Sequence, residues 1–149
     1  MMKNGLMDDL LVAARDAAKA GDVPVAAAIV APDGTVVALA SNRMTRDGNA
    51  LHHAEILAIN AALDKTGKAR LDGYDLWVTL EPCAMCAGAI AHARLRRVYF
   101  AAYDIKAGAV ESGIRFFDHP SCHHHPEIYG GLSEQAASAM LSDFFATKR

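Results

Sequence analysis

The chain has 149 residues, a length that fits one compact domain spanning residues 1–149. Its hydrophobic content of 52% excludes a disordered polar chain, because folding can bury enough apolar surface to offset the entropy of ordering. The formal net charge of -2 excludes the general basic excess of many nucleic-acid-binding proteins. Any contact with RNA must therefore be local.

The sequence carries no membrane or secretion signal that we can identify. No apolar run approaches the ~18 residues that a membrane span requires, and the first eleven residues are interrupted by Lys3, Asp8 and Asp9. Two of the three cysteines, Cys83 and Cys86, are separated by two residues, a spacing typical of metal or redox chemistry. We therefore expect a cytoplasmic protein with no membrane partner.

The first half of the chain predicts a helix, a hairpin and a second helix. Apolar residues recur at helical spacing over residues 6–20. Two β-prone apolar runs, 23–30 and 35–40, are joined by the turn sequence at 32–34, which predicts a hairpin buried on both faces. A polar loop follows, and residues 52–65 then show helical periodicity again.

The second half predicts two more strands and two more helices. Residues 74–80 and 97–102 are rich in β-branched and aromatic residues, and residues 83–93 follow Pro82 at a position where proline can open a helix. An irregular stretch covers 104–125, and the last helix begins at Ser133. This order predicts an α/β fold with one sheet and helices on both faces.

Two short motifs lie at the starts of predicted helices and could share one metal ion. His53-Ala54-Glu55 opens one helix, and Cys83-Ala84-Met85-Cys86 opens another. Cysteines three residues apart lie on the same helix face, and the positive helix end favours their thiolates. Two thiolates and one imidazole are ligands that select zinc over hard cations. We therefore expect zinc on His53, Cys83 and Cys86.

The number of ligands indicates which kind of zinc site this is. Structural zinc is closed by four protein ligands, whereas catalytic zinc keeps a position for water and lowers the pKa of that water to about 7. The motifs supply three ligands, and Glu55 is placed to carry a proton. The alternative is a closed structural zinc whose fourth ligand comes from the segment 122–125.

The two motifs together match the H-x-E…P-C-x-x-C signature of zinc-dependent base deaminases. The chain as a whole closely resembles the bacterial tRNA-specific adenosine deaminases, which convert adenosine to inosine at the wobble position of an anticodon. The resemblance covers nearly the whole length and is carried by five segments: residues 23–25, 41–43, 53–55, 79–88 and 141–145.

The resemblance implies a three-layer α/β/α cytidine-deaminase-like fold with one mixed sheet, a homodimer, and one zinc ion per chain. It also implies a tRNA anticodon stem-loop as substrate, with the target base splayed into a pocket. Asn42 would hydrogen-bond the adenine, Asp104 and Lys106 would lie beside flanking nucleotides, and Phe145 would contact the RNA. By residue type alone, Asn42 could equally cap a turn, and Phe144 and Phe145 could pack in the core.

Three positions depart from the family pattern. Ala26 replaces a usual glycine and would place a methyl group near the base pocket. His123 replaces a common asparagine that would contact RNA, and Tyr103 replaces an arginine present in some relatives. Two alternative functions stay open: a deaminase of free guanine, cytosine or cytidine, and a non-catalytic zinc-stabilised RNA-binding subunit. The presence of Glu55 disfavours the second of these.

Overall fold

The computed structural model describes residues 2–148, which form a mixed five-stranded sheet with the strand order β2-β1-β3-β4-β5. The central strand β3 pairs antiparallel with β1 and parallel with β4, and β1 pairs antiparallel with β2. The strand β5 pairs parallel with β4, so β2, β3, β4 and β5 all run in the same direction and their carboxyl ends share one edge of the sheet. The strands span Ala26–Val30 (β1), Val36–Ser41 (β2), Asp75–Leu80 (β3), Arg97–Ala102 (β4) and Glu127–Gly130 (β5).

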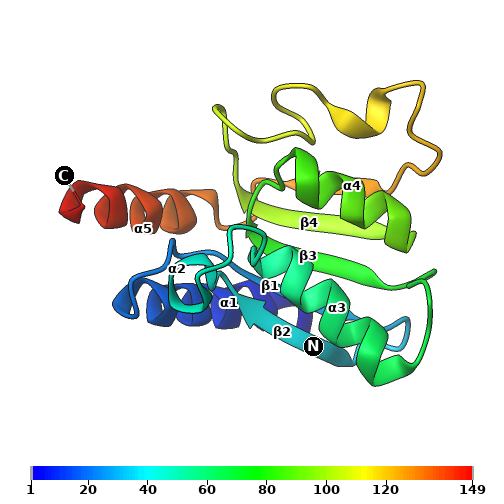
Figure 1. Cartoon of the computed structure of the whole chain (residues 1–149), viewed down its shortest axis with the longest axis horizontal. Coiled ribbons are helices and arrows are strands. Elements are labelled where there is room, and N and C mark those ends of the chain that lie inside the picture. Colours follow the sequence, from blue (N-terminus) through cyan, green and yellow to red (C-terminus); the bar gives the residue numbers. More distant parts are fainter. Residues whose placement is uncertain (1, 149) are drawn as a thin grey trace.

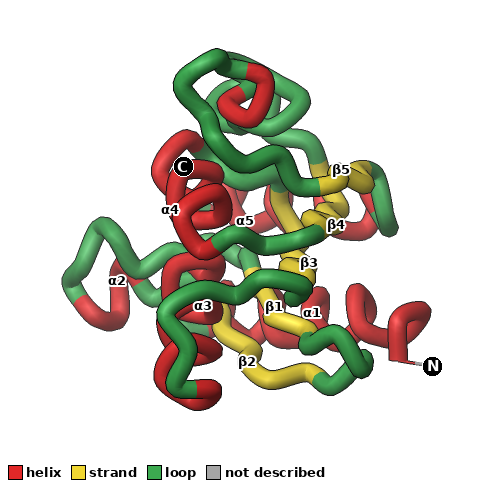
Figure 2. The backbone as a smooth tube through the Cα atoms, turned by 90° about the vertical axis from the view of Figure 1, so that its right-hand side faces the viewer, coloured by secondary structure: helices red, strands yellow, loops and turns green. Residues whose placement is uncertain are grey.

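Helices cover both faces of the sheet, as expected for an α/β/α fold (Figure 1). Viewed along the sheet, α3 and α4 lie on one side and α1 lies on the other (Figure 2). Helix α5 packs against β4 and α1, and its far end extends past the sheet. The helices span Met2–Lys19 (α1), Met44–Asp47 (α2), Ala54–Thr66 (α3), Ala84–Ala93 (α4) and Glu134–Thr147 (α5), with a 3₁₀ turn η1 at Phe116–Asp118.

The strand β1 separates two hydrophobic cores because every one of its residues is buried. Ala26 and Ala28 face α1, whereas Ala27 and Ile29 face α3. The small alanine side chains let α1 lie close to the sheet. Within residues 2–148, none of the helices is both long and apolar enough to cross a membrane.

The structure confirms the predicted order of the main elements and corrects four details. The strand β2 is not buried on both faces, because it lies at the sheet edge and leaves Leu39 49% exposed. The short strand β5 was not predicted, since its four residues alternate between polar and apolar for too few positions to show a period. The single turns α2 and η1 lie in segments that were expected to be irregular.

Three aromatic side chains stack across β3, β4 and β5. The strand register places Trp77 beside Tyr99 and Tyr99 beside Tyr129. The ring centroids are 4.2 Å apart in the first pair and 5.0 Å in the second, with interplanar angles of 19° in both. Such cross-strand aromatic pairs stabilise the register of a sheet.

Candidate active site

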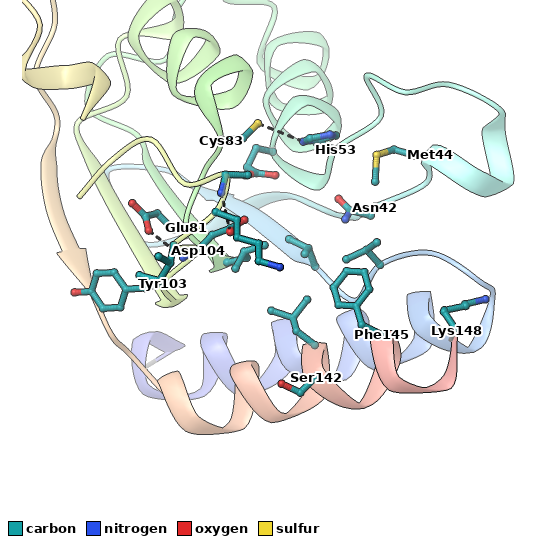
Figure 3. Close-up of a pocket in the computed structure, with 18 of the residues that line it drawn as sticks. Asn42, Met44, His53, Glu81, Cys83, Tyr103, Asp104, Ser142, Phe145 and Lys148 are labelled. Carbon is teal, nitrogen blue, oxygen red and sulfur yellow. Dashed lines mark hydrogen bonds between the residues drawn. The ribbon is translucent and has the colours of Figure 1, made fainter. Parts of the chain in front are cut away.

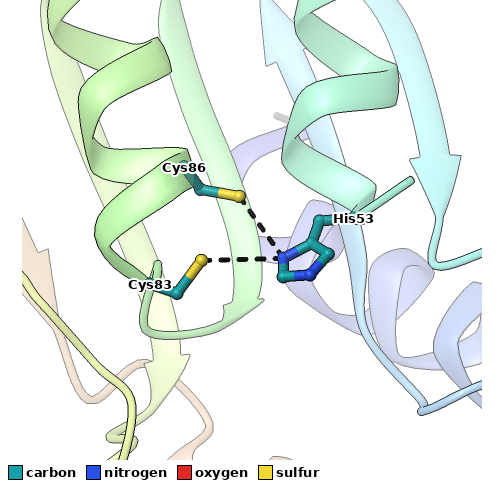
Figure 4. A group of neighbouring side chains, drawn as sticks. All are labelled: His53, Cys83 and Cys86. Atoms are coloured by element: carbon teal, nitrogen blue, oxygen red, sulfur yellow. Dashed lines mark hydrogen bonds between the residues drawn. The ribbon is translucent and has the colours of Figure 1, made fainter. Parts of the chain in front are cut away.

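The two predicted motifs meet at the edge of the sheet where β2, β3 and β4 end. His53 immediately precedes α3, Cys83 immediately precedes α4, and Cys86 lies in the first turn of α4. The helices α3 and α4 are neighbours on the same face of the sheet. Their amino-terminal ends therefore bring the three side chains together, although His53 is far from the cysteines in sequence (Figure 4).

The spacing of the three side chains fits a zinc ion. His53 Nδ1 lies 3.6 Å from Cys83 Sγ and 3.6 Å from Cys86 Sγ. Tetrahedral zinc with bonds of about 2.3 Å to sulfur and about 2.0 Å to nitrogen requires a sulfur–nitrogen separation of about 3.5 Å. The donor atoms are thus arranged at the distances that a shared zinc ion demands, and Nδ1 is the ring nitrogen that faces the thiols.

A closed four-ligand site does not form here. Among residues 2–148, no other histidine, cysteine or carboxylate joins this group at metal-binding distance. The segment proposed as an alternative source of a ligand makes other contacts. Cys122 Sγ donates to the carbonyl of His124, and the imidazole of His124 contacts the carbonyl of Leu95 at 2.6 Å. The three-residue cluster therefore leaves room for a water or substrate atom.

Glu55 stands beside this cluster with its side chain removed from solvent. It is 4% exposed, in the first turn of α3. Burial raises the pKa of the Glu55 carboxyl to about 7, and the neighbouring Cys83 thiolate contributes in the same direction. A carboxyl group with a pKa near neutrality can both accept and donate a proton, which is the property that general acid–base catalysis needs.

The pKa values of the Cys83 and Cys86 thiols are shifted in opposite directions. The thiol of Cys86 donates a hydrogen bond to Cys83 and thereby lowers the pKa of Cys83 to about 4, with a further contribution from His53. The same interaction and burial raise the pKa of Cys86. Cys83 also lowers the free energy of the protonated imidazole, so the pKa of His53 is raised. The thiolate is thus stabilised at Cys83, and a thiolate is the form of cysteine that binds a metal ion.

An open cavity of about 960 Å³ leads to His53, Glu55 and Cys83. Its walls come from the loop after β2, the loop after β4 and the helix α5 (Figure 3). The four residues that sequence reasoning assigned to substrate all line it: Asn42, Asp104, Lys106 and Phe145. Sequence reasoning assigned no substrate role to further lining residues: Val23, Val25, Met44, Leu80, Glu81, Ile105, Ala107, Leu141, Ser142, Ala146 and Lys148.

A hydrogen bond to the start of α3 fixes the orientation of the Asn42 side chain. Its Oδ1 atom accepts a hydrogen bond of 2.8 Å from the backbone N–H of Ala54, at the start of α3. This contact is a cap of the kind that sequence reasoning considered as an alternative role. Because the oxygen is used, the Nδ2 amide group is the part of Asn42 available to the cavity that it lines. Asn42 can therefore serve both roles at once.

A buried ion pair that sequence reasoning missed holds the Asn42 loop. The carboxylate of Asp22, fully buried after α1, accepts a hydrogen bond of 2.6 Å from Thr45 N–H and pairs with the guanidinium of Arg46. Arg46 in turn donates a hydrogen bond of 2.6 Å to the backbone carbonyl of Asn42. Asp22 thus fixes α2 and the main chain of Asn42 together.

The aromatic pair on α5 divides between two environments. Phe145 is 46% exposed and projects toward the cavity opening (Figure 3), whereas Phe144 is half-buried and packs edge-on against it. The ammonium group of Lys148 lies 5.3 Å from the centre of the Phe144 ring. Phe144 is not part of either core cluster, so the expected core packing is only partial.

The positions that depart from the family pattern affect the cavity unequally. Ala26 packs beneath α1 and does not line the cavity, so the expected crowding of the base pocket by its methyl group is wrong. His123 is exposed and does not line the cavity either. Tyr103 does line it, and its hydroxyl donates a hydrogen bond of 3.0 Å to Glu111.

Arg94, Arg96 and Arg97 form the densest basic cluster in the sequence, and none of them lines this cavity. Arg96 and Arg97 both approach Asp75, which begins β3 at the opposite end of the strands, and the distances are 3.0 and 4.0 Å. The positive charges that border the cavity are instead those of Lys106 and Lys148. Local positive charge is therefore present at the cavity border despite the negative net charge.

A mixed sheet, a His–Cys–Cys cluster at the ends of two helices and a buried glutamate beside it are together the architecture of a base deaminase. Comparison with known proteins gives the same class, since the family described as MafB19-like deaminase matches residues 1–147. A tRNA-specific adenosine deaminase from Agrobacterium fabrum is 49% identical over 143 residues, which cover 96% of this chain and 93% of the relative. The chain belongs to this deaminase family.

Solved structures give matching results. A structure from a study of A-to-I editing by tRNA:A34 deaminases at the wobble position of transfer RNA has a TM-score of 0.88 and 49% identity. The alignment covers 91% of the present chain and 97% of the chain in that structure. The guanine deaminase from Nitrosomonas europaea has a TM-score of 0.83 at 26% identity, and it covers 96% of this chain and 84% of that chain. The fold is therefore shared with enzymes that are named for different bases.

Proposed function

We propose that the protein hydrolytically removes the 6-amino group of adenosine at the wobble position of a tRNA anticodon loop, which leaves inosine in the RNA and releases ammonia. The observation that carries the proposal is the cavity, which joins the His53, Cys83 and Glu55 side chains to a rim with an exposed aromatic ring and two lysines. The 49% identity to a tRNA-specific adenosine deaminase over nearly the full lengths of both chains supports the same substrate.

His53, Cys83 and Cys86 would hold one zinc ion per chain, because their donor atoms have the spacing that zinc requires and because two thiolates and an imidazole are typical zinc ligands. Zinc bound there would supply a water molecule with a pKa near 7, so that hydroxide is accessible at neutral pH. Glu55 is assigned to proton transfer and not to metal binding, since it lies outside the ligand group.

Glu55 would move two protons during the reaction. Its carboxylate first accepts a proton from the attacking water, and the resulting carboxylic acid donates that proton to a ring nitrogen of adenine as the new C6–O bond forms. Glu55, again a carboxylate, would then accept the proton of the new C6 hydroxyl group and pass it to the amino group as the C6–N bond breaks, so that ammonia leaves and the C6 carbonyl of inosine forms. The pKa of about 7 suits both directions of transfer.

The remaining lining residues would bind the base and the RNA around it. Asn42 would donate from Nδ2 to an acceptor nitrogen of the purine, with its own oxygen held by α3. Asp104 and Lys106 would lie beside the flanking nucleotides. Phe145 offers a face on which an unstacked base can stack, and Lys106 and Lys148 are placed to approach phosphates.

A second candidate is deamination of a free base, because the chain also shares its fold with a guanine deaminase at 26% identity. The metal cluster and Glu55 would serve either substrate. The sequence identity to the tRNA-specific relative is nearly twice as high, and the open cavity with a solvent-exposed Phe145 suits a base that is still attached to RNA.

The substrate is tested by incubating the zinc-loaded protein separately with an arginine-tRNA anticodon stem-loop, free guanine and cytidine. We expect inosine at the wobble position of the stem-loop, detected by nuclease digestion and mass spectrometry, with one ammonia released per inosine. A stem-loop with guanosine at the wobble position is the matched control. Ammonia released only from guanine or cytidine would contradict the proposal and favour the second candidate.

The resemblance to the tRNA-specific family also leads us to propose a homodimer that works in the cytoplasm. A tRNA substrate accounts for that location, since mature tRNA is used there. The negative net charge argues against general attraction to RNA, and Lys106 and Lys148 supply positive charge locally at the cavity.

A further inference from the structure

Glu81 is a buried carboxylate between β3 and the metal-binding motif, and the reaction outlined above gives it no task. Its side chain is 2% exposed. One carboxylate oxygen, Oε1, accepts from Asp104 N–H at 3.0 Å and from the Ser112 hydroxyl at 2.8 Å. The other, Oε2, accepts from the N–H groups of Val110, Glu111 and Ser112 at 3.1, 2.8 and 2.8 Å.

All five donors belong to one segment, residues 104–112. The first four residues of that segment, from Asp104 to Ala107, form one wall of the cavity. The two carboxylate oxygens of Glu81 accept five hydrogen bonds in all, so they are fully engaged by this one segment.

The segment fits closely around the carboxylate. Gly108 forms an isolated β-bridge with Cys83, and Ala109 N–H donates to the carbonyl of Pro82 at 2.9 Å. A Cβ atom added at Gly108 would lie 2.6 Å from Glu81 Cδ and 2.4 Å from the carbonyl oxygen of Asp104. Both separations are too short for a non-bonded contact of a Cβ atom, so only glycine allows the observed approach.

We propose that Glu81 is a positioning residue that holds residues 104–112 as the outer wall of the cavity and thereby determines how well the site accepts a base within RNA. It acts through Asp104, with which it shares a hydrogen bond (Figure 3), and it neither transfers a proton nor binds the metal. The part of this proposal that concerns RNA rests on the proposed function. The part that concerns the wall does not.

The first test measures hydrogen exchange at single amides in the zinc-loaded protein and in Glu81→Gln. Glutamine keeps the shape of the side chain but replaces one acceptor oxygen with a donor, which faces N–H groups that can no longer be satisfied. We expect exchange to accelerate by about tenfold or more at residues 104 and 110–112. Amides in the middle of α3 should be unchanged. Asp118→Asn is the matched control, because that carboxylate is exposed and lies close by in sequence.

The second test measures deamination of the anticodon stem-loop. In Glu81→Gln we expect KM to rise by about tenfold with a smaller change in kcat and with one zinc ion still bound per chain, because Glu81 contacts the wall and not the ligands. Glu81→Asp retains the charge but shortens its reach, so we expect it to recover part of the loss. A role limited to fold stability would change the free energy of unfolding but would leave KM unaltered.

Gly108→Ala is a second variant that tests the same proposal if Glu81→Gln does not fold. The alanine methyl group displaces the wall without altering the carboxylate, so the same rise in KM and the same faster exchange are expected. In the double variant the two effects should be much less than additive, because both act on one segment. Unchanged exchange at residues 104 and 110–112 in either folded variant would overturn the proposal, as would an unchanged KM.

The two readouts separate this proposal from the proposed function. If the unaltered protein does not deaminate the stem-loop, the proposed function fails, and the RNA part of the inference fails with it. The exchange rates of the Glu81 variants still decide whether Glu81 holds the wall. If the stem-loop is deaminated and the exchange rates do not change, only the role of Glu81 is wrong.

Discussion

Glu55 carries a conflict between stability and function. Ionising a buried carboxyl group near a thiolate costs free energy, which is why the pKa of Glu55 is raised to about 7. Replacing Glu55 by a neutral side chain should therefore stabilise the folded state. The same replacement should abolish turnover, because the new side chain cannot carry a proton. Such opposition is typical of residues that are kept for their reactivity.

This conflict gives a prediction for Glu55→Gln. Turnover of the stem-loop should fall by at least about hundredfold, because glutamine cannot carry a proton. Zinc content should remain one ion per chain, and the melting temperature should be equal to or higher than that of the unaltered protein. Steady-state kinetics, metal analysis and thermal unfolding provide the three measurements. Loss of zinc from the folded variant would show that Glu55 is a ligand, contrary to its assigned role.

Sequence reasoning identified the residues whose roles are visible in short motifs. His53, Cys83 and Cys86 were found because their types and spacing suggest metal chemistry, and the structure brings them together. Asp22 and Glu81 were not found, because nothing near them in the sequence shows that they are buried. Their partners lie more than twenty residues away, and only the fold brings them into contact.

At the level of elements, each of the two loops that frame the cavity is anchored by one buried carboxylate. Glu81 holds the loop after β4, and Asp22 holds the loop after β2 through Thr45 and Arg46. Loops supply most of the cavity wall, so their conformation must be fixed by the rigid elements beneath them. Both anchors are placed at the ends of regular elements, where the backbone is already held.

Asp22→Asn tests the second anchor. At pH 7 the variant should lose about 2 kcal/mol of the free energy of unfolding, because an ionised hydrogen-bond acceptor is replaced by a neutral amide beside Arg46. Asp72→Asn, at an exposed ion pair with Arg70, should change this free energy by less than about 0.5 kcal/mol. Chemical denaturation of both variants measures the difference.

The stability lost in Asp22→Asn should depend on pH in a defined direction. Burial alone would raise the pKa of Asp22, but the hydrogen bonds from Arg46 and Thr45 outweigh it and lower the folded-state pKa below the ordinary value of 3.8. The ionised group therefore stabilises the fold above about pH 4, and this contribution is lost as the pH falls through the folded-state pKa. A difference between variant and parent that grew on acidification would contradict the assignment.

The long regular elements could be predicted because their periodicity extends over many residues. The strand β5 and the turn α2 could not, since four residues do not establish a period and their pairing depends on distant segments. The start of helix α5 was correctly predicted at Ser133. The Ser133 side chain, however, makes no capping hydrogen bond, and the Ser133 backbone is in the left-handed region. The boundary of α5 was therefore predicted correctly from the preference for serine as a helix cap, although Ser133 does not cap the helix.

At the scale of the whole molecule, the candidate metal cluster links two parts of the chain. His53 belongs to the α3 region, which packs on β1 and β2, whereas Cys83 and Cys86 belong to α4, which follows β3. A shared ion would therefore join the amino-terminal ends of two neighbouring helices. Metal binding to the folded state alone adds to the free energy of unfolding, by about 4 kcal/mol at a thousand times the dissociation constant.

Removal of zinc should consequently lower the stability of the entire fold. Dialysis against a strong chelator should decrease the melting temperature, and adding back stoichiometric zinc should restore it. Cys86→Ser should show the lower melting temperature without chelator and no response to zinc. Cys122→Ser is the control, because that cysteine lies outside the cluster and bonds only to a backbone carbonyl. A Cys86→Ser protein that still responds to zinc would contradict the ligand assignment.

The aromatic stack across the sheet makes these measurements possible without a label. Trp77 is the chain's single tryptophan, is only 4% exposed, and lies against Tyr99 in the middle of the sheet. Its emission should change when the sheet opens, because its indole would pass from tyrosine neighbours into water. It does not line the cavity, so occupancy of the active site should leave the signal nearly constant. Trp77 fluorescence is therefore an intrinsic probe of unfolding that should respond little to substrate binding.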